Sequence, residues 1–396
     1  MKRVYILICL LVQTASVVIA QTVPNSVDAI LQSIAKNNKQ IKAQSQEAKA
    51  QKMENRSANN LADPTVSYAS TYSNAAEGGH STEFIAAQSF DFPTQYIARG
   101  RQAALQNEVV DMQALAARRD ILLKAKMLCL DIIMLNKESE FLKKRAEMGK
   151  ELTALMRRKK DLGDANAIEL NKLKMELMDL NTEIAQNDAS HRTALQQLLA
   201  MNDNMPLEMS LSVYPQVKPV ADYDSFRDEL IASDIDIQTM TASTKATEKQ
   251  VSVQRQSWLP KLEVGFRRNT TSEASENGFV VGGSLPIFEN RKKVGIAKAR
   301  AVSARYMQEA VKMERENQVM AMYNEMQQMK SAIDAYDLGL MYDYLDLLSK
   351  SLRLGQISMI EYFVEAEDTF GKLQYYFQLE NRYQRLMAEV YSFLLP

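Results

Sequence analysis

Apolar residues recur along this chain with two different periods. In four stretches every second residue is apolar, which is the period of a half-exposed β-strand. These stretches are 65–72, 83–92, 261–270 and 279–285. Between them lie long runs in which apolar residues recur every three or four positions, the period of a helix. The pattern predicts an α+β chain in which two β-hairpins are set between long helices.

The predicted helices are much longer than those of a compact globular domain. They cover 25–61, 94–159, 167–201, 224–258, 291–353 and 359–394. The second of them would extend ~97 Å at 1.5 Å per residue, whereas helices in globular proteins average ~11–12 residues. Such lengths indicate long α-helical hairpins packed side by side as the wall of a tube.

The same order of elements occurs twice. The spacing between matching landmarks is 196 positions for Pro64 and Pro260, 193 for Pro93 and Pro286, and 192 for Gly163 and Gly355. Agreement among three landmarks indicates an internal two-fold repeat. The predicted divisions are 1–20 (signal peptide), 21–201 (first repeat: helix, β-hairpin, long helix, break, helix), 202–223 (linker or equatorial segment) and 224–396 (second repeat).

The predicted signal peptide rests on three features. Lys2 and Arg3 form a basic start, residues 4–11 are almost uninterruptedly apolar, and 18–20 read Val-Ile-Ala before Gln21. This is the pattern of a secretory leader with its cleavage site. A lipid anchor at Cys9 is not expected, because the large Ile8 precedes it.

Composition narrows the function further. The 48 basic and 49 acidic residues leave no positive surplus for binding nucleic acid. After the signal peptide only Cys129 remains, so no internal disulfide is possible. No run approaches ~20 apolar residues, the length of a membrane-spanning helix, so any entry into a membrane would be by strands.

No catalytic or metal-binding arrangement is present in the sequence. It contains no nucleophile–histidine–acid pattern, zinc-ligand spacing or phosphate-binding glycine loop, so we predict neither an enzyme nor a cofactor. The 22 methionines invite a copper interpretation. However, Met322, Met326 and Met329 have the spacing of an ordinary buried helical stripe, and we predict no metal site.

Four strands cannot complete a membrane barrel alone. Small barrels need about eight strands, and lipid does not tolerate unpaired sheet edges. Three copies would supply ~12 strands, within the range of outer-membrane barrels. We therefore expect a homotrimer with a 12-stranded transmembrane β-barrel above a trimeric α-barrel. Its lipid-facing strand residues would be Phe84, Phe90, Leu262, Val264, Phe266 and Phe279.

Several short motifs carry a family resemblance. They are WLPKL at 258–262, LPIF at 285–288 followed by RKK at 291–293, and LGQISMIEY at 354–362, with a first-half copy at 162–169. With their doubling and spacing, the mature chain resembles the outer-membrane efflux protein family, the TolC-like channels. The first-half segment at Pro93 lacks the family's Leu-Pro-Leu-Phe form, and the chain is short for the family.

The resemblance implies a function and partners. Such proteins are homotrimers of the Gram-negative outer membrane with a large periplasmic tunnel, and they dock to an inner-membrane pump through a periplasmic adaptor. The expected role is the exit duct of a tripartite efflux or type I secretion system, conducting small toxic molecules or secreted products passively. The alternative is a structural periplasmic coiled-coil protein without a pore, which would have no use for paired strands of membrane-spanning length.

The resemblance also nominates site residues. A pore constriction would contain Glu361 and Glu365, although Glu367 and Asp368 continue the acidic run and a solvated helix face remains an alternative. The expected adaptor-contact tips are Leu162, Gly163, Glu169, Leu354, Gly355 and Ile360. Arg157, Arg158 and Arg353 are candidates for salt bridges that close the tip, or residues that only add solubility.

Overall fold

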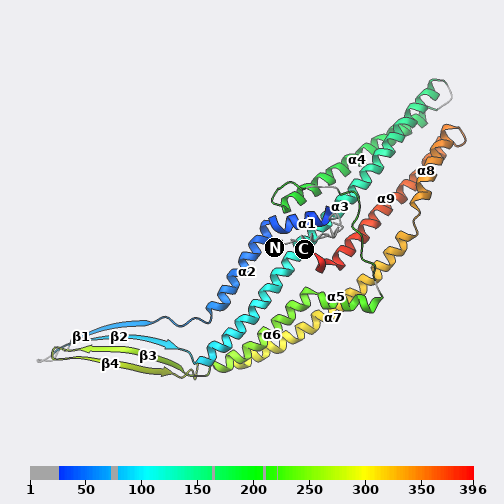
Figure 1. Cartoon of the computed structure of the whole chain (residues 1–396). Coiled ribbons are helices and arrows are strands. Elements are labelled where there is room, and N and C mark those ends of the chain that lie inside the picture. The colour runs from blue at the N-terminus through cyan, green and yellow to red at the C-terminus, as the bar shows by residue number, and fades with distance from the viewer. Residues whose placement is uncertain (1–25, 73–78, 163–165, 208–210, 221) are drawn as a thin grey trace, which may run out of the picture.

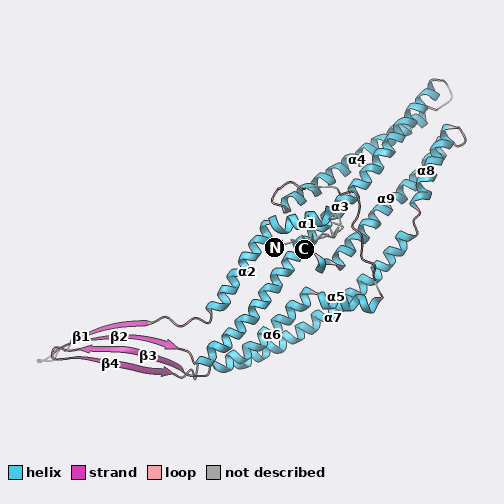
Figure 2. Cartoon of the chain, viewed as in Figure 1, coloured by secondary structure: helices cyan, strands magenta, loops and turns pink. Residues whose placement is uncertain are grey.

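The computed structural model describes residues 26–72, 79–162, 166–207, 211–220 and 222–396. The predicted signal peptide at 1–20 and the tip residue Gly163 lie outside these ranges. The protein is elongated, with a four-stranded sheet at one end and two helical hairpin tips at the other (Figure 1). Helices make up nearly all of the rest (Figure 2).

The elements follow one another as two similar halves. The first half contains α1 (Ser26–Asn37), α2 (Lys39–Ser57), β1 (Thr65–Tyr72), β2 (His80–Phe90), α3 (Pro93–Asp161) and α4 (Ala167–Met201). The second contains α5 (Tyr223–Ser233), α6 (Ile235–Gln256), β3 (Lys261–Thr270), β4 (Ser275–Ser284), α7 (Lys293–Asp334), α8 (Leu338–Arg353), α9 (Met359–Val390) and a final 3-10 turn (Ser392–Leu394).

The sheet is a meander of two hairpins. Its order is β1-β2-β3-β4, and every neighbouring pair is antiparallel. The predicted bounds of β1 and β3 are confirmed, while β2 begins earlier than expected, at His80. The turn predicted over 271–278 is shorter than expected, because Thr271 accepts and donates hydrogen bonds with Ala274 and β4 already begins at Ser275.

Helix α3 runs the length of the helical region. Its 69 residues correspond to ~104 Å at 1.5 Å per residue. Pro93 stands at its first position, where the missing N–H costs nothing because that group has no partner within the helix. Helix α2 lies along the part of α3 near the sheet and α4 along the part near the tip (Figure 1). The predicted bounds of α4 are confirmed.

Two predicted helices are wrong as single elements. The segment 25–61 divides at Asn38, whose side chain accepts the Ile41 N–H at 3.0 Å and so begins α2. The segment 224–258 divides at Asp234, which caps α6 by accepting the Ile237 N–H at 2.8 Å. In both places a polar side chain competes with the helical backbone for hydrogen bonds. The two breaks are 196 positions apart, as are Pro64 and Pro260, so they belong to the repeat.

The predicted helix 291–353 is also wrong as a single element. It begins only at Lys293, after Lys292 adopts a left-handed conformation with φ 68°. It then stops at Asp334, and α8 begins after Asp337, whose side chain accepts the Leu340 N–H at 2.9 Å. The second long column is therefore two helices, while α3 in the first half is one.

Three apolar cores hold the described helices together. One joins α1, α3 and the end of α4 around Leu122 and Leu198. A second fills the tip between α3, α4, α8 and α9 around Leu173 and Leu373. A third joins α5, α7 and the end of α9 around Met326. Among the described helices, none combines the length and apolar character needed to cross a membrane.

Candidate functional site

The sheet has one apolar and one polar face. Its register places Phe84 beside Tyr68, Phe90 beside Leu262, Val264 beside Val281 and Phe266 beside Phe279. The six residues predicted to meet lipid therefore share one face. Most of their side chains are exposed in the single chain, Phe279 to 88%. An exposed apolar surface of this extent indicates a contact with lipid or protein.

The opposite face is polar and small. Glu83 and Arg267 form an ion pair of 2.5 Å across β2 and β3. Gly265 lies opposite Ala87 on this face, where an added Cβ would stand 2.7 Å from the Ala86 carbonyl oxygen. Alternation of apolar and polar faces on ~10-residue strands is the pattern of a barrel wall with lipid outside and water inside.

Gly355 forms the turn at the α8–α9 tip. Its φ is +74°, a conformation that side chains disfavour. The Gln356 N–H donates to the Ser351 carbonyl at 2.9 Å and the Gly355 N–H to the Leu352 carbonyl at 3.1 Å. These two bonds are the Schellman arrangement that ends a helix. The turn at Gly355 is therefore left-handed, and its first-half counterpart Gly163 lies outside the described residues.

The tip residues present apolar side chains to solvent. Leu162 is 77% exposed, Leu354 73% and Ile360 59%. Glu169 stands in the first turn of α4, where its charge favours the positive helix start. The end of α3, the start of α4 and the Gly355 turn lie at the end of the molecule farthest from the sheet (Figure 1). The described tip residues thus lie at one end of the molecule, and their contact with an adaptor stays a prediction.

Glu361 has a local role that the sequence analysis missed. Its carboxylate accepts the Ser358 N–H at 2.7 Å, while the Glu361 N–H donates to the Ser358 hydroxyl at 3.2 Å. This capping box begins α9. The hydrogen bonds to Ser358 lower the pKa of the Glu361 carboxyl below its ordinary value, so the residue carries its charge at neutral pH.

Glu365 and one of the three tip arginines, Arg353, contact side chains on neighbouring helices. The Tyr344 hydroxyl donates to Glu365 at 2.9 Å, which joins α8 to α9. Arg353 forms an ion pair of 2.6 Å with Glu151 and so joins α8 to α3. Within the described ranges, Arg157 and Arg158 make no ion pair. Among the residues that the structure describes, Arg353 is the one predicted salt-bridge residue that links two helices.

The sequence analysis also missed a buried arginine in the tip. Arg145 on α3 has a side chain only 6% exposed, and it contacts carboxylates on two other helices. It forms ion pairs with Glu176 and, at 3.5 Å, Glu183 on α4, and at 2.9 Å with Glu367 on α9. Burial raises the pKa of the Glu367 carboxyl, and Arg145 opposes that effect. Glu367 therefore holds helices together and is not simply part of a solvated face.

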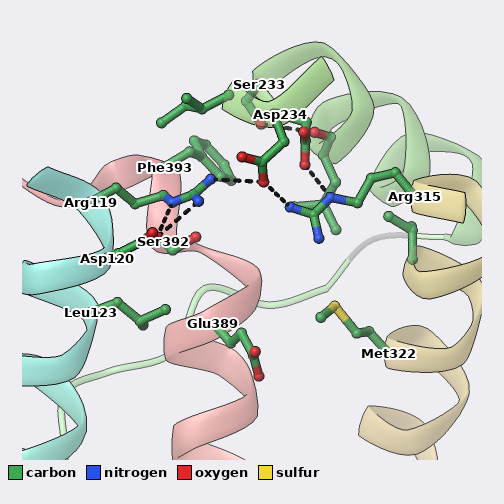
Figure 3. A pocket seen from close by; sticks show the side chains of 14 residues that line it. Arg119, Asp120, Leu123, Ser233, Asp234, Arg315, Met322, Glu389, Ser392 and Phe393 are labelled. Atoms are coloured by element: carbon green, nitrogen blue, oxygen red, sulfur yellow. Dashed lines mark hydrogen bonds and ion pairs between the residues drawn. The ribbon is translucent and has the colours of Figure 1, made fainter. Parts of the chain in front are cut away.

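A second charged cluster lies midway along the molecule, where a cavity of about 280 Å³ opens between α3, α5, α6 and α7. Figure 3 shows Arg119 and Arg315 approaching it from opposite sides. Arg315 contacts Asp234 at 2.5 Å and Asp236 at 2.8 Å, and Arg119 contacts Asp236 at 3.4 Å. The paired charges join the two halves at the helix break at Asp234. Among the described residues, no three His, Cys, Asp or Glu side chains form a group able to hold a metal ion.

Known proteins resemble this chain both in part of its sequence and in its fold. The family described as "Outer membrane efflux protein" matches residues 226–358. VceC from Vibrio cholerae is similar in structure, with a TM-score of 0.73, 13% identity, and coverage of 93% of this chain and 96% of that chain. The Campylobacter jejuni CmeC outer membrane channel has a TM-score of 0.72, 14% identity and coverage of 93% and 85%. CusC has a TM-score of 0.71, 14% identity and coverage of 94% and 92%. No curated protein matches the chain in sequence.

The matched segment contains the hairpin of β3 and β4, the residues that connect it to α7, then α7, α8 and the Gly355 turn. All of these elements are described above. About a third of the chain, residues 226–358, thus matches the outer membrane efflux protein family. Its fold is TolC-like: long helices with one four-stranded antiparallel sheet. The family consists of transport channels of the Gram-negative outer membrane with a periplasmic helical portion. The predicted resemblance to this family and the predicted TolC-like fold are therefore confirmed.

Proposed function

We propose that three copies of this chain form an exit duct through the outer membrane, which conducts small toxic molecules or secreted products passively in a tripartite efflux or type I secretion system. The barrel wall would come from the sheets and the periplasmic tunnel from the helices. TolC-like channels as a class are trimeric, which supports the assembly.

The observation that carries this proposal is the incomplete sheet. Among the residues that the structure describes, strands β1 and β4 each have one unpaired edge, and the apolar face is exposed. Edges of this kind cannot be left in lipid, because every backbone group there needs an internal partner. Joining β4 of one copy to β1 of the next satisfies both edges, and three copies supply ~12 strands, a permitted barrel size.

The assembly is tested by native mass measurement and planar-bilayer recording. The detergent-extracted protein is expected to be a homotrimer that produces discrete conductance steps. A water-soluble monomer that produces no conductance would contradict the proposal and would favour the coiled-coil alternative.

The faces of the sheet provide a test with a matched control. Phe279 and Val280 are neighbours on β4 with side chains on opposite faces. Phe279→Arg is expected to destabilise the folded barrel by ~2–4 kcal/mol if it faces lipid near the midplane, whereas Val280→Arg on the channel side should have much less effect. The measurement is a refolding titration in vesicles. Equal effects at both positions would contradict the assigned faces.

We further propose that Glu361 and Glu365 line the constriction near the tips. Glu361 is held in its charged form, and three such carboxylates around an axis would attract cations. Glu361→Gln is expected to reduce cation preference in single-channel recordings. Glu309→Gln, an exposed glutamate on α7 far from the tip, is the control. Unchanged selectivity in Glu361→Gln would show that Glu361 lies on a solvated helix face and not in a constriction.

The adaptor and pump are proposed to meet the apolar tips. A photo-crosslinking residue at Leu354 should capture a periplasmic adaptor in intact cells, while the same residue at Leu340, 66% exposed on α8 away from the tip, should not. Gly355→Val should weaken this capture without changing the barrel, because the side chain strains the turn. Equal capture from both positions would contradict a docking site at the tip.

A further inference from the structure

An apolar hollow lies where the sheet meets the first long helix. Its volume is about 540 Å³, within the ~300–1,000 Å³ range of ligand sites. Strands β2 and β3 form one wall and the first turn of α3 the other. The lining residues are Phe90, Asp91, Pro93, Tyr96, Ile97, Leu262 and Val264. We name this site the seam hollow.

The chemistry of the seam hollow favours hydrocarbon over peptide. Asp91 is the one ionisable carboxyl in its lining, and that carboxylate is already paired with Arg99. The Tyr96 hydroxyl is engaged as well, since it accepts the Asp91 N–H at 3.1 Å. A bound peptide would bring backbone groups that need partners, and the hollow offers almost none. Ile97 remains 56% exposed beside it, so its apolar wall has no cover within the described chain.

The position of the seam hollow excludes a second copy of the chain as its cover. Copies in the proposed trimer join through the edge strands β1 and β4. The hollow lies on β2 and β3, the two central strands, on the same face as Phe84 and Phe266. It therefore continues the surface assigned to lipid, past the ends of the strands and onto α3.

Charge at its rim fits a lipid headgroup. Arg99 lies over the Tyr96 ring at 5.0 Å, and its guanidinium has five N–H donors, more than its carboxylate partner uses. On the other side of the sheet's base, Arg291, Lys292 and Lys293 follow β4 with Glu289 as the nearby acid. Basic and aromatic residues at the edge of an apolar band are typical of the membrane interface.

We propose that the seam hollow holds one acyl chain of a membrane phospholipid, with its phosphate beside Arg99. The inference rests on the proposed membrane position of the sheet and adds a specific bound lipid to it. One such molecule per chain would fill the joint between strands and helix, where protein atoms leave a gap.

The sole tryptophan provides the assay. Trp258 is 45% exposed, and its neighbour Leu259 accepts a hydrogen bond of 3.5 Å from Gln95, in the first turn of α3 beside Tyr96. Phosphatidylglycerol with brominated acyl chains, added to the trimer in detergent, should quench Trp258 fluorescence saturably at one lipid per chain. Unlabelled phosphatidylglycerol should reverse the quenching, and glycerol 3-phosphate should not.

Variants decide whether the hollow is the site. Ile97→Asp should raise the half-saturating lipid concentration at least about tenfold, because a charge replaces an apolar wall. The milder Ile97→Ser should give a smaller increase and decides the matter if Ile97→Asp fails to assemble. Ile296→Asp, at a similarly exposed position on α7 outside the hollow, should change nothing. Quenching that does not saturate, that glycerol 3-phosphate reverses, or that both Ile97 variants leave intact would overturn the inference.

The same samples separate this inference from the proposed function. A conducting trimer without saturable quenching contradicts the bound lipid alone. A water-soluble monomer without conductance contradicts the exit duct, whatever the quenching shows.

Discussion

The two halves of the molecule differ most at the same level of their long helices. Counted by the 192-position spacing of Gly163 and Gly355, Arg145 in the first half corresponds to Asp337 in the second. At Arg145 the helix continues, and the side chain joins α3 to α4 and α9. At Asp337 the helix has broken, and the side chain serves only to begin α8.

The long helix of the first repeat, α3, is therefore continuous, whereas the corresponding column of the second repeat is divided into α7 and α8. Helix α3 is held along its whole length by buried contacts. Helix α8 is attached through fewer contacts, among them Arg353 with Glu151 and Tyr344 with Glu365. A short helix with a break behind it and exposed ion pairs opens more easily than a continuous one. We expect the α8–α9 hairpin to be the more mobile tip.

The largest expected effect on stability follows from removing the positive charge of Arg145, which has no counterpart in the second half. Arg145→Met leaves Glu176, Glu183 and Glu367 close together without a cation. We expect about 2–3 kcal/mol of destabilisation, below the usual range for a fully buried pair because Glu367 is partly solvated. Hydrogen exchange across α3, α4 and α9 measures it. Arg157→Met, an exposed site, is the control.

A pH series sharpens this prediction. Burial raises the pKa of the Glu367 carboxyl, and without Arg145 nothing on that side opposes this rise, so near that pKa the folded protein binds more protons than the unfolded one. Stability of Arg145→Met should therefore rise as the pH falls toward 4.5, the ordinary value for a glutamate. A variant that loses stability equally at all pH values would show that the loss is one of packing alone.

The next prediction concerns two glycines of the second half, at which substitution by alanine should have opposite effects on stability. Gly355→Ala should destabilise the tip by about 1 kcal/mol, because its φ of +74° disfavours any side chain. Gly371→Ala in α9 should stabilise by ~0.5–1 kcal/mol, because an added Cβ meets nothing within 4 Å and helix interiors disfavour glycine. Thermal melts of the two variants should shift in opposite directions. Shifts of the same sign would contradict the assigned turn.

The break between α7 and α8 is tested at Asp337. Asp337→Ala removes the cap of α8 and should cost ~1 kcal/mol, while Asp337→Asn keeps an accepting oxygen and should cost little. Faster hydrogen exchange confined to 335–342 is the expected result in the alanine variant. Exchange that spreads equally into α3 would show that the two columns open as one unit.

The smallest effect is expected at Glu361. Its pKa is lowered in the folded state, so its contribution to stability is present above the ordinary glutamate pKa of 4.5 and is lost as the pH falls through the lowered value. Glu361→Gln keeps an acceptor for the Ser358 N–H and should remove most of this pH dependence with little change at pH 7. Glu361→Ala should lose the capping box at every pH. Identical pH profiles for wild type and Glu361→Gln would contradict the role of the charge.

Local patterns predicted some elements to the residue. Alternation placed β1 and β3, and helical periodicity with Asn166 and Asn202 at its ends placed α4. These features depend on neighbours in sequence, so the sequence contains what is needed to find them.

What could not be predicted depends on choices between competing partners. Asn38, Asp234 and Asp337 interrupt helices because their side chains capture backbone N–H groups, although the apolar period runs on past each of them. A comparison of the two repeats would have exposed the first two, since they occupy matching positions. The Ser-x-x-Glu pattern at 358–361 is a capping signal that is visible in the sequence.

The Arg145 cluster was beyond the sequence. Its partners lie 31, 38 and 222 positions away, and nothing local distinguishes them from other surface glutamates. The only hint was an arginine inside the apolar stripe of Phe141, Leu142 and Ala146. The seam hollow likewise needs the strand register and the direction of α3, which tertiary packing sets.

The 196-position recurrence of the helix breaks has a consequence for symmetry. Three copies of a chain that is itself nearly doubled would place six similar units around one axis. The ring would not be truly six-fold, because continuous α3 helices with Arg145 would alternate with α7–α8 columns that are broken before Asp337. Any partner with six equal contacts would therefore meet two environments in alternation, and three of its six subunits would bind differently from the other three.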